Sequence, residues 1–137
     1  MGLLERKQRC CHSESIELDA KNVMGFTAFM MACWKGNKDV VKLLMDHSDR
    51  IDLNARSNLG FTAFMIACKE GRKDVVKFLL GHSDRIDLNA RKKWDKTAFS
   101  EAWLNGRTDV VQLLLEYSEV LDIEIPERFQ LQKLKNE

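Results

Sequence analysis

The chain has 137 residues, with 22 Lys and Arg against 21 Asp and Glu, so its formal net charge is +1. An apolar content of 45% and a charged content of 31% are typical of a globular domain, and the balanced charge argues against an overall field that draws the chain to nucleic acid or an anionic membrane. No stretch approaches 18 uninterrupted apolar residues, and the N-terminus turns charged at Glu5, so we expect neither a transmembrane helix nor a signal peptide.

The N-terminal segment 1–15 carries two of the four cysteines and is predicted to be a polar tail or cap. Cys10, Cys11 and His12 offer three soft ligands, but tetrahedral zinc requires spaced pairs and a fourth ligand, so we expect no metal site. Adjacent cysteines are poorly placed to bridge each other, and Cys33 and Cys68 lie in apolar stretches. This usage favours a reducing compartment, the cytoplasm or the nucleus.

Self-similarity at an offset of 35 residues dominates the sequence from residue 22 onward. Residues 22–56 and 57–91 share 25 identities in 35 positions, and residues 92–126 form a third copy that has diverged further. A short period repeated three times predicts a stacked array in place of a single-core domain.

Each repeat contains two short helical patterns. In the first repeat, Thr27 is a predicted N-cap, and Gly36 is a predicted C-cap of the first helix. Asn37 then begins a second helix. Its apolar residues, Val40, Val41, Leu43, Leu44 and Met45, span such a wide arc that we expect both sides of this helix to be buried. A polar loop and a turn centred on Gly60 lead into the next repeat.

These residues resemble the ankyrin repeat. The resemblance rests on Gly-Phe-Thr-Ala-Phe-Met-Ile-Ala-Cys at 60–68, Gly71, Asp-Val-Val-Lys-Phe-Leu-Leu at 74–80 and Asp-Leu-Asn-Ala at 87–90. It implies an all-α solenoid of stacked helix–turn–helix units with β-hairpin loops. Ala-Phe-Met stands where the family has Pro-Leu-His, and the loop is two residues longer than in a 33-residue repeat.

The array is expected to cover residues 16–126, with repeats at about 22–56, 57–91 and 92–126. Residues 127–137 overlap the start of a fourth first helix and are expected to form a partial repeat or a capping helix. Trp103 occupies the position of Cys33 and Cys68, and we expect its large ring to be a buried feature of a terminal repeat.

We expect no catalytic residues and no cofactor. Cys33 with His47, and Cys68 with His82, are imaginable pairs of nucleophile and base. Both pairs recur at the repeat period, however, and an active site has no reason to be duplicated with the scaffold. No glycine-rich phosphate loop is present, because turns and caps account for the glycines.

The resemblance places binding on the concave face, which in this family is built from hairpin tips and the exposed side of each first helix. We define the concave face here by the family's variable positions, five per repeat. They are Val23, Met24, Phe26, Trp34, Lys35, Asn58, Leu59, Phe61, Lys69, Glu70, Lys93, Trp94, Lys96, Leu104 and Asn105. Eight of the fifteen are apolar, which is typical of a protein-binding groove. An alternative is that Phe26 and Phe61 fold back and shield their own repeats.

The sequence therefore predicts a non-catalytic module that binds a protein or peptide, with Trp34 and Trp94 as aromatic anchors and lysines at the rim. Neither nucleic acid nor a membrane is an expected partner, since the basic run at 91–96 is one hairpin on a neutral chain. The second hypothesis is a structural segment of a longer ankyrin array, or a designed repeat scaffold, that associates end to end. The oligomeric state is accordingly a monomer or a weak end-to-end homo-oligomer.

Overall fold

The computed structural model describes residues 18–126. The predicted N-terminal tail with Cys10, Cys11 and His12, and the predicted partial repeat at 127–137, lie outside the described residues.

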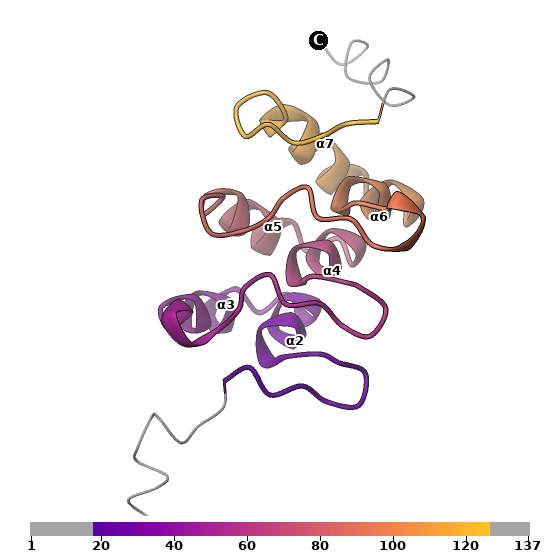
Figure 1. Cartoon of the computed structure of the whole chain (residues 1–137). Helices are drawn as coiled ribbons and strands as arrows, with labels where there is room; N and C mark the ends of the chain where they lie inside the picture. Colours follow the sequence, from indigo (N-terminus) through magenta and orange to yellow (C-terminus); the bar gives the residue numbers. More distant parts are fainter. Residues whose placement is uncertain (1–17, 127–137) are drawn as a thin grey trace, which may run out of the picture.

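The described part of the chain holds six α-helices in three pairs (Figure 1). They are α2 (Ala28–Lys35), α3 (Lys38–Met45), α4 (Ala63–Lys69), α5 (Lys73–Leu80), α6 (Ala98–Leu104) and α7 (Thr108–Tyr117). Two 3-10 turns, η2 (Ser48–Arg50) and η3 (Lys93–Asp95), lie in the connections. The prediction of an all-α stack of three helix pairs is confirmed.

The helices begin and end at capping residues of types that favour helix ends. Thr27 and Thr62 have extended backbones, and their hydroxyls accept hydrogen bonds from the backbone N–H three residues later at 3.2 Å. Gly36 ends α2 in the left-handed conformation, with φ of 72°. Asn37 caps α3 by accepting from the backbone N–H of Val40 at 3.3 Å. Each cap satisfies backbone donors or carbonyls that would otherwise lose their partners at a helix end.

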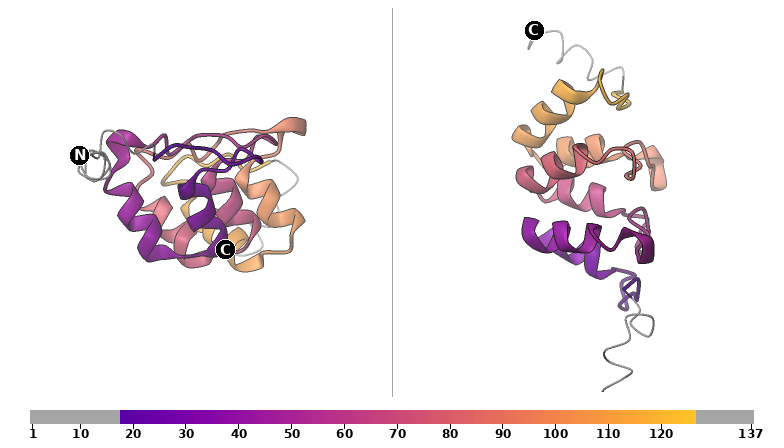
Figure 2. Two further views of the ribbon diagram at one scale, coloured as in Figure 1. Left: turned by 90° about the horizontal axis from the view of Figure 1, so that it is seen from below. Right: turned by 90° about the vertical axis from the view of Figure 1, so that its left-hand side faces the viewer.

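The pairs stack along one axis, with the first helices α2, α4 and α6 in one column and α3, α5 and α7 in the other (Figure 1). Viewed along that axis, the connecting loops project to one side of the helices (Figure 2). Phe29, Phe64 and Phe99 recur at the same position of each first helix and are fully buried. The core is therefore a continuous column built from one residue pattern used three times.

The loops contain less β-structure than the predicted hairpins. Only one isolated antiparallel bridge, Lys92 to Lys96, occurs among the described residues. The other two turns are each closed by two backbone hydrogen bonds. Asn22 N–H donates to Phe26 O at 3.0 Å and Gly25 N–H to Asn22 O at 2.9 Å; Ser57 N–H donates to Phe61 O at 2.9 Å and Gly60 N–H to Ser57 O at 2.9 Å. The turns are hairpin-like in position, but they are too short to form strands.

Polar side chains join each closing loop to the next. The Asn54 carboxamide accepts from the backbone N–H of Asp87 at 2.8 Å, and the Asn89 carboxamide accepts from that of Glu124 at 2.8 Å. Asp19 accepts from Asp52 N–H in the same register. The Asp19 and Asn54 contacts repeat with the period of the sequence, whereas the Asn89 contact is displaced by two residues along the third loop.

An arginine bridges each pair of successive repeats at the turn between their helices. Arg72 Nε donates to the Trp34 carbonyl oxygen at 2.8 Å, and Arg107 Nε donates to the Lys69 carbonyl oxygen at 3.0 Å. The arginine stem crosses the preceding glycine so closely that a Cβ on Gly36 or Gly71 would lie 2.8 Å from the arginine Cδ. We call this contact the arginine bracket.

Two expectations about burial are wrong at the ends of the stack. Trp103 is 40% exposed, whereas Cys33 and Cys68 at the same position are fully buried, because a following repeat covers the cysteines and none of the described residues covers the tryptophan in that way. In α3, Val40 and Leu43 are 38% and 58% exposed. Their counterparts in α7, Val110 and Leu113, are buried because α5 packs against them.

Alanine substitutions at Gly71 and Gly106 distinguish the cost of backbone strain from the contribution of the arginine bracket to stability. Gly71→Ala and Gly106→Ala both place a Cβ on a left-handed backbone, with φ of 72° and 68°, which costs about 1–2 kcal/mol. Only Gly71→Ala also displaces an arginine, since no described atom lies within 4 Å of a Cβ on Gly106. We expect urea unfolding to show Gly71→Ala less stable than Gly106→Ala by about 1 kcal/mol or more. Equal losses would show that the bracket contributes nothing.

Candidate protein-binding surface

The fifteen residues of the concave face lie on the turns that precede the first helices and at the C-terminal ends of those helices. None of the fifteen is buried. Val23, Leu59, Leu104 and Trp94 are among the most exposed large apolar side chains of the described chain. The stack does not use these side chains for its core, so their apolar character has no packing explanation.

The structure gathers Phe26, Trp34 and Phe61 of repeats 1 and 2 around one pocket of about 140 Å³. The Phe26 and Trp34 rings are 6.1 Å apart and inclined at 56°. Phe61 and Ile66 complete the apolar lining, and Lys69 and Glu70 border it. Phe26 and Phe61 are half-buried against the core, so they shield their own repeats in part while still lining the pocket.

Two lysines flank the Phe61 ring. Lys69 Nζ lies 5.7 Å and Lys92 Nζ 4.6 Å from the ring centroid, distances at which an ammonium group is attracted to an aromatic face. Lys69 also forms an ion pair with Glu70 at 3.4 Å, in a partly exposed position where such pairs contribute little. The apolar pocket therefore passes directly into a cationic region toward repeat 3.

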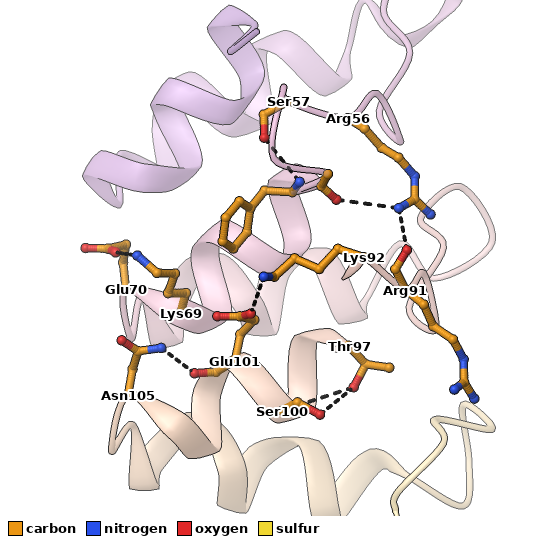
Figure 3. A network of polar contacts seen from close by, with 12 residues as sticks. Arg56, Ser57, Lys69, Glu70, Arg91, Lys92, Thr97, Ser100, Glu101 and Asn105 are labelled. Atoms are coloured by element: carbon orange, nitrogen blue, oxygen red, sulfur yellow. Dashed lines mark hydrogen bonds and ion pairs between the residues drawn. The ribbon is translucent and has the colours of Figure 1, made fainter. Parts of the chain in front are cut away.

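A buried ion pair forms the floor of that cationic region (Figure 3). Lys92 Nζ lies 3.0 Å from Glu101 Oε1, and the exposed fractions of the two side chains are 12% and 5%. Figure 3 shows Lys92 extended from the turn toward Glu101, with Asn105 donating to the Glu101 carbonyl oxygen at 2.7 Å. Removing either partner would leave a buried charge uncompensated.

This ion pair replaces a neutral arrangement found in the other repeats. Glu101 stands where repeat 2 has Ile66, and Lys92 stands where it has Ser57. The Ser57 hydroxyl accepts from the backbone N–H of Phe61 at 3.1 Å and so closes the turn. Lysine has no acceptor for that role. The charged residues Lys92 and Glu101, which lie at separate positions of the repeat, are thus explained together as one ion pair.

Trp94 lies at the tip of the third turn, 86% exposed and outside the pocket. Its backbone has φ of 66° and ψ of 26°, and Asp95 follows with φ of 54°. A left-handed backbone is uncommon for a bulky residue and is unfavourable by about 1–2 kcal/mol. The Trp94 ring adds almost no buried area to the fold, while its strained backbone lowers the stability of the turn.

Ile66, Lys92 and Glu101 belong to this surface, although the family's variable positions do not include them. A signal for them was present, because both Lys92 and Glu101 introduce charge where the other two repeats have neutral residues. Charge introduced twice in one repeat suggests a pair. Spacing alone did not show that positions 92 and 101 meet, since the turn and the helix are joined only by folding.

Neither cysteine of the two imagined cysteine–histidine pairs is accessible as a nucleophile, because both thiols are buried. Burial raises the pKa of the Cys33 thiol to about 12, and burial, with Cys33 as a lesser cause, raises that of Cys68. His82 Nδ1 lies 3.1 Å from the Phe78 carbonyl oxygen, and its ring packs on Phe78. Both cysteines are free and fully buried in the core.

Among residues 18–126, no group of three or more His, Cys, Asp or Glu side chains is arranged to hold a metal ion. Within the same range, no helix has the length and apolar character to cross a membrane.

Three helix–turn–helix units stacked at a constant offset, with turns along one side, define an α-helical solenoid. The family model described as ankyrin repeats matches this chain in three copies, over residues 3–92 and 50–126. The chain belongs to the ankyrin-repeat family. Repeats of this family are generally protein–protein interaction modules and are typically non-catalytic. A comparison with curated proteins gave no match.

The raised thiol pKa values predict chemical inertness. At pH 8, both Cys33 and Cys68 remain protonated and out of contact with solvent, so iodoacetamide should leave them unmodified in the folded protein. Peptide mass mapping checks this, with the urea-unfolded protein as the control in which both thiols react. Rapid labelling of either residue without denaturant would contradict the burial.

The strained turn predicts that replacing Trp94 stabilises the fold. Trp94→Asn places a residue that tolerates the left-handed conformation at a position with little packing to lose. We expect the free energy of unfolding to rise by up to about 1 kcal/mol. Leu59→Asn is the matched control, because Leu59 has the same register in repeat 2 without a positive φ. Destabilisation by Trp94→Asn would show that the ring supports the turn.

Proposed function

We propose that the concave face binds a segment of another protein or a peptide. An apolar side chain of the partner enters the pocket at repeats 1 and 2, and acidic groups of the partner lie toward repeat 3. The single observation that carries this proposal is the open aromatic pocket formed by Phe26, Trp34 and Phe61. An apolar pocket bordered by charged side chains is the usual form of a binding anchor site.

Differences between repeats 1 and 2 support this assignment. Ten of the 35 aligned positions differ, and four of those ten belong to the five concave positions of each repeat. Packing constrains the helix interfaces to nearly identical residues. The concave face is free of that constraint, and its composition changes from Val, Met, Trp and Lys to Asn, Leu, Lys and Glu.

Charge supports the expected chemistry of the partner. Lys35, Lys93 and Lys96 have no ion pair within the described part of the chain, whereas Lys69 and Lys92 are paired with Glu70 and Glu101. Three uncompensated cations on one surface favour an acidic partner and accelerate its association. A continuous phosphate backbone is a poorer fit, because Glu70 and Asp95 lie on the same surface.

The proposal includes a reducing compartment, either the cytoplasm or the nucleus. Its support is the free state of both described cysteines, which lie buried in a helix interface.

A photo-crosslinking amino acid tests where a partner binds. Placed at Leu59 on the concave face, it should capture a protein from cell lysate, which mass spectrometry then identifies. The same group at Lys77, an exposed residue of α5 outside the concave face, is the matched control and should not capture that protein. Capture at Lys77 but not at Leu59 would place binding on the opposite surface.

The identified partner then allows the anchors to be tested. We expect Trp34→Ser and Trp94→Ser to weaken binding by about 2 kcal/mol or more each, because aromatic residues at the centre of an interface carry most of its energy. The melting temperature should change little, and Lys77→Ser should leave affinity unchanged. Lys93→Glu should act mainly on the association rate and its salt dependence. Unfolding of the double tryptophan variant would make these residues part of the core and end the proposal.

A further inference from the structure

The turn before α6 differs from the other two turns in its contacts. In repeat 2, the Asn58 backbone N–H donates to the Met24 carbonyl oxygen at 3.1 Å, and the Asn58 carboxamide donates to the Val23 carbonyl oxygen at 2.9 Å. Lys93 stands at the Asn58 position in repeat 3 and makes no such hydrogen bond within residues 18–126. The third turn, drawn in orange, projects farther to the side than the first two (Figure 1 and Figure 2). Within the described range, its tip is therefore not bonded to the neighbouring turn.

The base of this turn is fixed by charged side chains. The buried ion pair joins Lys92 to Glu101 of α6 at 3.0 Å, and Arg91 forms an ion pair with Glu124, which follows α7. The Lys92 backbone N–H also donates to the Lys96 carbonyl oxygen at 2.9 Å and closes the turn. Helix α6 and the segment after α7 therefore hold the base from which the tip projects.

The tip of the turn presents Trp94. Its ring is almost fully exposed, and its backbone and that of Asp95 are both left-handed. The corresponding residues of the first two turns, Met24 and Leu59, are smaller, and only the glycine after each of them has a positive φ. Backbone strain of this kind persists where surrounding contacts hold it, and it is concentrated at functional sites. The turn thus holds a large apolar ring in solvent in spite of the strain in its own backbone.

A ring on a projecting tip is buried only by a surface that surrounds it. At repeats 1 and 2 the chain itself supplies the concave element, because Phe26, Trp34 and Phe61 line a pocket. At repeat 3 the protruding element is the ring of Trp94, so the concave element has to come from the partner. Tryptophan contributes most to an interface when it fills a desolvated pocket. Folded domains carry apolar clefts, whereas a short extended peptide has none.

The side chains beside the ring indicate the charge at the rim of such a cleft. Lys93 and Lys96 flank the tip and form no ion pair within residues 18–126. Carboxylates at the rim would complement these two lysines. Nucleic acid fits this turn less well, because the exposed Asp95 carboxylate lies between the two lysines in sequence and repels a phosphate backbone.

We propose that Trp94 inserts into an apolar cleft of a folded partner domain, with carboxylates at the rim of that cleft facing Lys93 and Lys96. This inference rests on the proposed function and narrows its partner from a protein segment or a peptide to a folded domain. Lys92 and Glu101 are positioning residues, because their ion pair fixes the turn that carries the ring. A ring held in place before binding loses little conformational freedom on association, which favours affinity.

Crosslinking from the tip of the turn tests whether the partner is folded. A photo-crosslinking amino acid replaces Lys93 in the full chain, next to the ring. The probes are native cell lysate, the same lysate treated with nuclease, and the same lysate digested into unfolded peptides by a lysine-specific protease that is then inactivated. We expect capture of a protein, identified by mass spectrometry, from the first two probes and no capture from the third.

The captured protein, produced on its own, then allows the contribution of the ring to be measured. Trp94→Asn should lower its affinity by about thirtyfold or more, as expected for an aromatic residue that fills a pocket. This variant is expected to fold at least as stably as the unchanged chain, so the loss reports binding. Val120→Asn is the matched control, because Val120 is a similarly exposed apolar residue outside the concave face, and it should leave affinity unchanged. Overlapping synthetic peptides that cover the partner's sequence should not bind measurably.

A further variant tests the positioning role. Lys92→Ser together with Glu101→Ile restores the neutral residues of repeat 2, so we expect the fold to be retained without the ion pair. In the chain that carries Trp94, this double change should weaken binding. In the Trp94→Asn background it should have no effect, because it acts through the ring. An equal loss in both backgrounds would overturn the positioning role.

The remaining outcomes separate this inference from the proposed function. Capture from the peptide digest, or tight binding of one synthetic peptide, would make the partner a linear segment and overturn the inference. Capture that nuclease abolishes would assign the turn to nucleic acid, with the same consequence. Capture at Leu59 together with an affinity that Trp94→Asn leaves unchanged would overturn the inference but leave the proposed function standing. Absence of capture at both Lys93 and Leu59 would overturn both.

Discussion

A single helix pair of this chain cannot bury both of its sides unless another pair packs on each of them. The other properties of the fold follow from that constraint. Val40 and Val110 belong to the same Asp-Val-Val motif, yet the first is exposed and the second is buried, because among residues 18–126 only the second has a preceding repeat packed against it. The same contrast separates Cys68 from Trp103 at the other end. Stability therefore resides in the contacts between neighbours, as expected for a solenoid.

Polar contacts fix the offset that the apolar contacts leave free. Apolar side chains attract without direction, whereas the arginine bracket and the loop amides require particular atoms to meet. The bracket also gives a second reason for glycine at the end of each first helix. Gly71 adopts a backbone conformation that other residues disfavour, and its missing side chain leaves room for the stem of Arg107. At Gly106 only the first reason operates within the described chain.

The side chains of the concave face are not fixed by these contacts between repeats, and their residue types therefore differ from one repeat to the next. Repeat 1 contributes an aromatic pair, Phe26 and Trp34, whereas repeat 3 has Lys96 and Leu104 at those positions and adds a buried carboxylate at Glu101. Glu101 is tolerated there because Lys92 compensates its charge, and the turn that lost its Ser side-chain acceptor is still closed by a backbone hydrogen bond from Lys92 to Lys96. The strained Trp94 fits the same pattern, because it is a surface residue whose ring adds almost no buried area to the fold.

The sequence by itself determined the period, the family and the helix ends at Thr27, Gly36 and Asn37, because these depend on local patterns that recur. Its prediction that both sides of the second helix are buried was correct for α7 and wrong for α3, and its prediction of a buried Trp103 was wrong. Burial at those positions depends on whether a neighbouring repeat is present, which no local pattern encodes. The pairing of Lys92 with Glu101 and the bracket from Arg107 to Lys69 were likewise decided only by tertiary structure, since each joins residues that meet when separate helices and turns are stacked.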